Sequence, residues 1–320
     1  MPKSPHPLKH SKTLNTTDLH AHTSVNSACI KLYTQQLSLI KATEHGVIND
    51  INETFLHEYR MGIRKTRVLL SELKWLLPNT SHLKFSAFFN WLNKITGSKR
   101  DIDVFIINLL SLETLLPKAL HDEFLTLQAH LVATQQTLHQ ALKEELQGAA
   151  YNTKLAEWEF FLNHELAEQS QLGKNHTLKH TADLTLKKAL NRLIIKGDAM
   201  TPASTPEALH SLRKNCKKLR YLIEFFQTLY SEKKTTNFIQ HIKALQETLG
   251  MLHDAHVQRE HLLSFSEELI AQHHYKHSLK IIPLLLEILD KQTTKSSLDF
   301  SKGYTDFVAC ADDIKEHYFK

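Results

Sequence analysis

Apolar residues recur along most of the chain at the spacing of one helical face, and no segment alternates as a half-buried strand does. Glycine and proline mark helix ends, because glycine commonly follows a helix and proline cannot continue one. These stops lie at Gly46, Pro78, Gly97, Pro117, Gly148, Gly173, Gly197 and Pro202. The pattern predicts an all-α protein with helices near residues 24–45, 50–77, 80–96, 98–115, 118–147, 151–169, 177–196, 205–230, 234–249, 251–270, 274–295 and 303–318.

The chain divides into a tail and two halves. Residues 1–23 are rich in Pro, Ser, Thr and His and predict a flexible tail. The halves are residues 24–172 and 173–320, and each is expected to form a bundle of four or more antiparallel helices. Pro283 falls within the predicted helix at 274–295, where it indicates a kink or the start of a new helix.

The two halves share an internal duplication with an offset of 153 residues, counted from position 57 to position 210. One duplicated element is a basic helical segment, with His57, Arg60, Arg64, Lys65 and Arg67 recurring as His210, Arg213, Lys217, Lys218 and Arg220. The other element repeats Gly97, Asp101 and Val104 as Gly250, Asp254 and Val257. A register kept without a gap over this distance is typical of repeated architecture.

Positive charge is concentrated in the duplicated segments. The chain has a net charge of +5. Segments 57–67 and 210–220 together hold nine Lys and Arg against one Glu, which gives +8 and leaves −3 for the rest. On a helix, positions 57, 60, 64 and 67 fall within an arc of about 80°, and the row they form is roughly 15 Å long.

Rows of like charge destabilise a helix unless acids or a ligand offset the repulsion. Neither row has acids on its own face, and Arg and Lys match phosphate oxygens, so the rows predict a strongly anionic ligand. His57 and His210 either donate to a phosphate oxygen or serve as packing or capping residues. The predicted contacts are His57, Arg60, Arg64, Lys65, Arg67, His210, Arg213, Lys214, Lys217, Lys218 and Arg220.

The second element is predicted to support the rows. Asp101 and Asp254 are expected to orient the basic side chains by hydrogen bonding, and Gly97 and Gly250 to precede helices. Ser98 could also cap a helix, with Asp101 three residues later completing a capping box, although the second copy has no such serine. Additional candidates for the anion site are Lys99, Arg100, His253, His256, Lys187, Lys188 and Arg192.

Both elements resemble those of the CHAD family, the conserved histidine α-helical domain. Segments 57–67 and 210–220 are similar to its H-x-x-R-x-x-x-R-(R/K)-x-R helix. Its L-G-x-x-x-D-x-x-V element is complete at 249–257, whereas Thr96 replaces the leucine in the first copy. The resemblance spans about residues 24–318.

This resemblance implies two four-helix-type bundles, related by pseudo-twofold symmetry around a basic central cavity that binds inorganic polyphosphate. It also implies association with polyphosphate granules or polyphosphate-metabolising proteins. CHAD domains are often fused to a CYTH triphosphatase, but the chain has no E-x-E-x-K motif, so we expect a standalone CHAD protein. The expected function is non-catalytic polyphosphate binding without a cofactor.

Two other functions stay open. Nucleic acid suits the same cations, although the rows lack interleaved aromatics for base stacking, and a metal-dependent hydrolase lacks an evident set of Mg²⁺ carboxylates beyond Asp101 and Asp103. The histidines form no plausible zinc set, so no metal or catalytic residue is assigned. Three isolated cysteines, no secretory signal and no apolar run that could span a membrane predict a cytoplasmic protein.

Overall fold

The protein is all-α in the computed structural model, which describes residues 19–166, 177–201, 204–271 and 280–318. Within these residues, β pairing is limited to a single bridge between Ser24 and Thr177. Short 3₁₀ turns and one π-helical turn, Phe161–Glu165, extend several helix ends. The helices are α1 (Val25–Ile48), α2 (Glu53–Glu72), α3 (Asn79–Leu112), α4 (His121–Gln147), α5 (Ala149–Phe160), α7 (Leu178–Asp198), α8 (Pro206–Phe226), α9 (Glu232–Ala271) and α10 (Ile281–Tyr318).

Several helices are longer than the sequence predicts. α3 runs unbroken through Gly97 and α9 through Gly250, so the predicted pairs 80–96 with 98–115 and 234–249 with 251–270 are wrong. Ser98 lies inside α3 and caps nothing. A glycine costs a helix interior only about 1 kcal/mol, which packing readily offsets.

Most of the other predicted stops lie at helix ends. Gly46 and Gly197 lie in the last turns of α1 and α7, which end within two residues of the predicted stops. α10 joins most of the last two predicted helices, 274–295 and 303–318, into one. Gly148 precedes α5 as predicted. Pro283 stands in the first turn of α10, where its missing N–H breaks no helical hydrogen bond, so the predicted new helix start is confirmed. Gly173 and Pro202 lie outside the described residues.

Packing divides the chain into two compact units assembled from non-consecutive segments. The first unit comprises the described residues of the segments Met1–Arg100, Thr137–Thr185 and Glu224–Glu232. The second comprises those of Asp101–Gln136, Leu186–Ile223 and Lys233–Lys320. The boundary at 172/173, the symmetry and the duplication of structure stay predictions.

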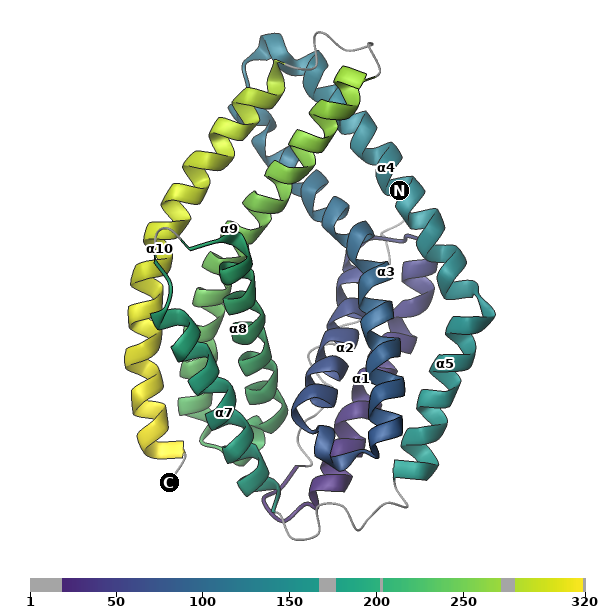
Figure 1. Ribbon diagram of the computed structural model, residues 1–320, viewed down its shortest axis with the longest axis vertical. Coiled ribbons are helices and arrows are strands. Elements are labelled where there is room, and N and C mark those ends of the chain that lie inside the picture. Colours follow the sequence, from purple (N-terminus) through teal and green to yellow (C-terminus); the bar gives the residue numbers. More distant parts are fainter. Residues whose placement is uncertain (1–18, 167–176, 202–203, 272–279, 319–320) are drawn as a thin grey trace. The chain divides into compact units, whose positions relative to one another are not determined.

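The first unit packs around Trp158 of α5, whose side chain is fully buried. Its ring centroid lies 5.0 Å from that of Tyr33 and 4.7 Å from that of Phe85. α1 and α2 lie side by side (Figure 1), so close that a Cβ atom on Gly62 would come within 2.8 Å of Ile40. α2 is therefore held against the core of this unit by its apolar face.

The second unit contains nearly all of α8, α9 and α10 (Figure 1), together with the last part of α7, the end of α3 and the first part of α4. Cys216 of α8 is buried, and its Sγ lies 3.8 Å from the carbonyl oxygen of Ile242 in α9. Phe238 of α9 stacks on Phe307 of α10 at 5.8 Å, and the hydroxyl of Tyr304 donates to the carbonyl oxygen of Ile194 in α7. The apolar face of α8 thus packs inward, which fixes the orientation of its basic face.

Candidate anion-binding site

The first basic row lies on α2 and consists of His57, Arg60, Arg64, Lys65 and Arg67. α2 begins at Glu53 after Asn52, whose side-chain oxygen accepts from the Thr54 amide at 3.0 Å. Its apolar side chains are buried in the first unit, whereas His57 is exposed and Arg64, Lys65 and Arg67 are half-buried. Most of the row therefore reaches solvent, as an anion site requires.

Arg60 differs from the rest of this row because only 7% of it is exposed. Its Nη1 donates to the carbonyl oxygen of Asn93 at 2.9 Å and to Oγ1 of Thr96 at 2.7 Å, both on α3. The guanidinium thus links α2 to α3. We infer that Arg60 positions the row, with direct ligand contact left to its neighbours.

The remaining cations of the first row have neighbours that the sequence did not predict. Lys65 Nζ lies 3.1 Å from Oε2 of Glu224, and Arg67 Nε donates to Oδ1 of Asn90 at 2.8 Å. Burial, and then the positive charge of Arg64, lower the pKa of Arg67. Crowded cations of this kind favour an anion, since a bound anion relieves their mutual repulsion.

The second basic row lies on α8 and consists of His210, Arg213, Lys214, Lys217, Lys218 and Arg220. Lys214 is exposed, and the other five are half-buried. The opposite face of α8 buries Leu212, Cys216 and Leu219. α2 and α8 therefore present the same arrangement: one face in the core of a unit and one cationic face.

Arg213 and Asp254 form the polar contact expected of an orienting aspartate. Arg213 Nη2 lies 3.4 Å from Oδ1 of Asp254 on α9, and 18% of the arginine side chain is exposed. Asp101, the corresponding residue of the first copy, is exposed, and its charge acts on His210. The two aspartates consequently have different surroundings.

Gly97 and Gly250 occupy equivalent places beneath an arginine of each row. A Cβ atom built on Gly97 would lie 3.7 Å from Arg60 Nη1, and one on Gly250 would lie 3.9 Å from Arg213 Nη2. Each guanidinium thus crosses the adjacent helix where a side chain is missing. This packing, rather than a helix end, is the structural role of the two glycines.

We expect Gly97→Ala to be neutral or to stabilise the protein by about 0.5–1 kcal/mol, because a methyl group fits at this distance and alanine favours a helix. Gly97→Leu should displace the Arg60 guanidinium from Asn93 and Thr96 and lower the free energy of unfolding by about 2–4 kcal/mol. Urea unfolding followed by circular dichroism measures both effects. Equal stability of the two variants would contradict the packing role.

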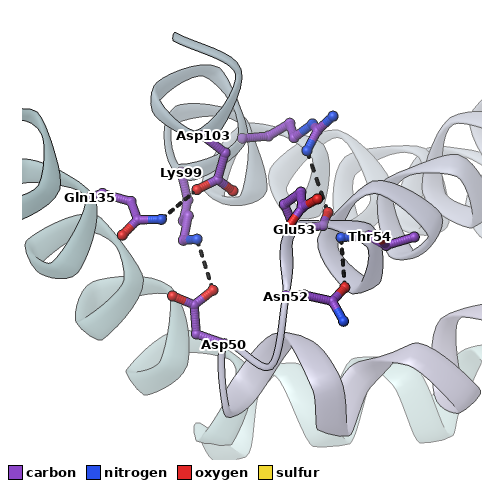
Figure 2. Close-up of polar contacts among 8 residues, drawn as sticks. Asp50, Asn52, Glu53, Thr54, Lys99, Asp103 and Gln135 are labelled. Atoms are coloured by element: carbon purple, nitrogen blue, oxygen red, sulfur yellow. Dashed lines mark hydrogen bonds and ion pairs between the residues drawn. The ribbon is translucent and has the colours of Figure 1, made fainter. Parts of the chain in front are cut away.

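The additional candidates divide into buried and accessible residues. Lys99 is only 2% exposed, and its Nζ lies 2.8 Å from Oδ1 of Asp50, as Figure 2 shows. Arg100 is half-buried, and its Nη1 lies 3.4 Å from the carbonyl oxygen of Glu53. On α7, Lys187 and Lys188 are exposed and Arg192 is half-buried. Lys99 is thereby assigned to the structure of the α1–α2 turn.

His210 and His253 form a pair between α8 and α9. Their ring centroids are 4.7 Å apart. Burial lowers the pKa of His210, and Lys214, Arg213 and Lys217 lower it further, while Asp101 acts in the opposite direction. The pair stands at the start of the second row, so it shares the electrostatic field of the row.

Sequence reasoning missed the polar residues that hold the first row. Asn90, Asn93 and Thr96 follow one another at a helical spacing of three, which is a readable stripe within the predicted helix 80–96. Glu224 gave no comparable signal, because its contact with Lys65 joins residues far apart in the sequence.

Neither a metal site nor a membrane span is found among the described residues. No three His, Cys, Asp or Glu side chains in this part of the chain are grouped to hold a metal ion. None of its helices combines the length and the apolar character that a membrane-spanning helix needs.

Comparison with protein families identifies the fold. The family model described as "CHAD domain" matches residues 31–263, which is more than half of the chain. The chain belongs to the CHAD domain family. CHAD domains are in general polyphosphate-binding domains. No curated protein matches the sequence significantly.

Two solved structures share the CHAD fold of this protein. The crystal structure of the CHAD domain from the plant Ricinus communis has a TM-score of 0.75 at 21% sequence identity, covering 90% of this chain and 94% of that chain. PptA from Streptomyces chartreusis has a TM-score of 0.67 at 10% identity, covering 88% of this chain and 100% of that one. The predicted all-α CHAD fold is thus confirmed.

Proposed function

We propose that this CHAD protein binds inorganic polyphosphate without catalysis, through the basic rows of α2 and α8. The observation that carries the proposal is the pair of equivalent helices, each with one face in a core and a half-buried cationic row on another. Half-buried cations interact with an anion in a lower dielectric than fully exposed ones and hold less of their hydration. Arg64, Arg67, Lys217 and Arg220 are the proposed direct contacts, with Arg60 and Arg213 in positioning roles.

Nucleic acid is disfavoured by the placement of the aromatic residues. Tyr59 on α2 and Tyr221, Phe225 and Phe226 on α8 are buried, and Phe55 of α2 is half-buried with its ring against Gly46 of α1. Binding of single-stranded nucleic acid typically uses exposed aromatic rings on which bases stack. A ligand that offers phosphates and no bases fits these two faces better.

The test is a competition assay with labelled polyphosphate of one defined length. We expect unlabelled polyphosphate to displace the probe and equal phosphate concentrations of duplex DNA or RNA to leave it bound. If about four phosphates are neutralised, a fourfold rise in salt should weaken binding by about fifty- to a hundred-and-fiftyfold. Displacement by duplex DNA at equal phosphate concentration would favour the nucleic-acid function instead.

Catalysis is disfavoured by the state of the nearest pair of carboxylates. Asp103 is 3% exposed, and Gln135 Nε2 donates to its Oδ1 at 2.8 Å (Figure 2). A buried, hydrogen-bonded carboxylate is poorly available to coordinate Mg²⁺ together with Asp101 and a phosphate. Polyphosphate incubated with the protein and Mg²⁺ should accordingly release no phosphate.

Association with polyphosphate granules would follow from polyphosphate binding by the two basic rows.

A further inference from the structure

The histidine pair of the second unit combines close ring contact with an incomplete set of hydrogen bonds. The rings of His210 and His253 are 4.7 Å apart and inclined by 38°. His210 Nδ1 is buried and has no hydrogen-bond partner among the described residues. A protonated ring would need an acceptor for this N–H, so the ligand-free structure favours a neutral His210.

Positive groups of α8 surround the pair, namely Arg213, Lys214 and Lys217. The charge of His256 on α9 also acts on His253. Burial first, and then Arg213, His210, Lys217 and His256, lower the pKa of His253 to about 3. Both rings are therefore neutral near pH 7 in the absence of an anion.

Negative groups near the pair are few, and they are partly engaged by other cations. Asp101 on α3 raises the pKa of His210, but less than the surrounding cations lower it. Asp254 on α9 lies against Arg213, and Glu207 on α8 is exposed and interacts with the charge of His256. The balance around the two rings is positive, so a bound anion would add the counter-charge that they need.

Beside the rows, the first copy of the duplication has a fixed charge where the second copy has a titratable one. The residue 153 positions before His253 is Arg100, and the residue 153 positions before His256 is Asp103. Arginine keeps its charge at any physiological pH, whereas histidine changes its charge near neutrality. Histidine in place of arginine thus makes the surroundings of the second row titratable, whereas those of the first row keep a fixed charge.

We propose that His210 of the second basic row and His253 beside it on α9 take up protons when polyphosphate binds, so that the affinity of the second row rises as the pH falls. The proposal rests on the proposed function and specifies how the site is regulated. Phosphate oxygens close to the rings favour the imidazolium form through their negative charge and accept hydrogen bonds from its accessible N–H groups.

The sign of the effect follows from linkage between proton and anion binding. A bound anion raises the pKa of each ring above its ligand-free value, so the complex holds more protons than the free components. The gain in affinity is fully present at pH values below the pKa values of the ligand-free rings. It shrinks as the pH rises from these pKa values to the higher pKa values of the complex. Above the pKa values of the complex, the gain is absent. Each proton taken up raises the affinity by at most tenfold per pH unit within this window.

The experiment measures proton uptake during binding. Wild-type protein and His253→Arg are titrated with polyphosphate of one defined length by calorimetry at pH values from about 5.5 to about 8.0. Two buffers with different ionisation enthalpies give the number of protons taken up. We expect the variant to take up about one proton fewer below neutral pH and to bind more tightly than wild type at the upper end, because it carries the fixed charge that Arg100 supplies on α3.

His241→Arg is the matched control, because it adds the same charge to a half-buried position on α9, twelve positions before His253. This control should keep the wild-type proton uptake. Wild-type uptake in His253→Arg would overturn the proton-linked site while leaving polyphosphate binding intact. Absence of binding at every pH would overturn the proposed function, and this inference with it.

His253→Gln provides a second variant if arginine does not fit between the helices. Glutamine is neutral and of similar size, so the pH dependence should flatten and the affinity at low pH should fall several-fold. Nuclear magnetic resonance of the imidazole groups provides a direct readout in the wild-type protein. The pKa of His253 should rise when polyphosphate is added, and an unchanged value would contradict the proposal.

Discussion

Exchanging Arg64 and Lys217 together for glutamate is expected to lower polyphosphate affinity by about a hundredfold to ten-thousandfold. Both side chains are half-buried on the cationic faces of α2 and α8. Each substitution removes a charge-assisted contact, worth about 1.5–3 kcal/mol, and places a carboxylate where phosphate would bind. The loss of about 3–6 kcal/mol in total converts to this range of affinity. Fluorescence anisotropy of a labelled polyphosphate measures it, and circular dichroism checks the helix content.

The control for this variant carries the same change of net charge at a distance from the rows. Lys31→Glu with Lys302→Glu also takes the chain from +5 to +1, and both lysines are exposed, on α1 and α10. Arg60 is not a suitable residue for charge reversal in the first row, because its loss would also break the contact with α3. Wild-type affinity in the Arg64/Lys217 variant would show that the rows do not form the site. Binding stoichiometry in the two single variants then tells whether one ligand uses both rows.

Trp158→Ala is expected to destabilise the protein by about 3–5 kcal/mol, the largest effect on stability from one substitution that we predict. The indole is fully buried, and the rings of Tyr33, Phe85, Phe89 and Phe161 surround it. Its removal leaves a cavity where helices of the first unit meet. Urea unfolding followed by circular dichroism measures the loss, which is a large fraction of the total stability of an ordinary domain.

Two further substitutions serve as comparisons for the destabilisation expected of Trp158→Ala. Trp158→Phe should cost clearly less, because it keeps an aromatic ring and removes an indole N–H that is buried without a hydrogen-bond partner among the described residues. Trp75→Ala makes the same chemical change at a tryptophan that is 42% exposed and should cost less than about 1 kcal/mol. Similar losses for Trp75→Ala and Trp158→Ala would show that the core is not organised around Trp158.

The helical content and the basic rows could be predicted because both depend on periodicity. The predicted helix 205–230 agrees with α8 and the turn that follows it, and the predicted helix 50–77 agrees with α2 and its extension. On α2 the spacing of Leu56, Tyr59 and Ile63 fixes which face is buried. The placement of the cations on the other faces follows from the same spacing.

The glycines show where periodicity misleads. Gly97 and Gly250 have the local signature of a helix end, yet each lies inside a long helix below a guanidinium from another helix. The deciding contacts join residues 37 positions apart in both cases, counted from Arg60 to Gly97 and from Arg213 to Gly250. That shared spacing was visible in the duplication, but its meaning required the packed helices.

The sequence by itself determined that this protein is helical, that it contains two matched cationic rows and that it has the motifs of the CHAD family. These properties are local, since they depend on side chains a few residues apart on one helix. The tertiary structure decided that Arg60 and Lys99 are buried and engaged, that Glu224 lies beside Lys65, and that His210 meets His253. Burial and the charge of distant neighbours set the role of each ionisable group, and both arise only when helices pack together.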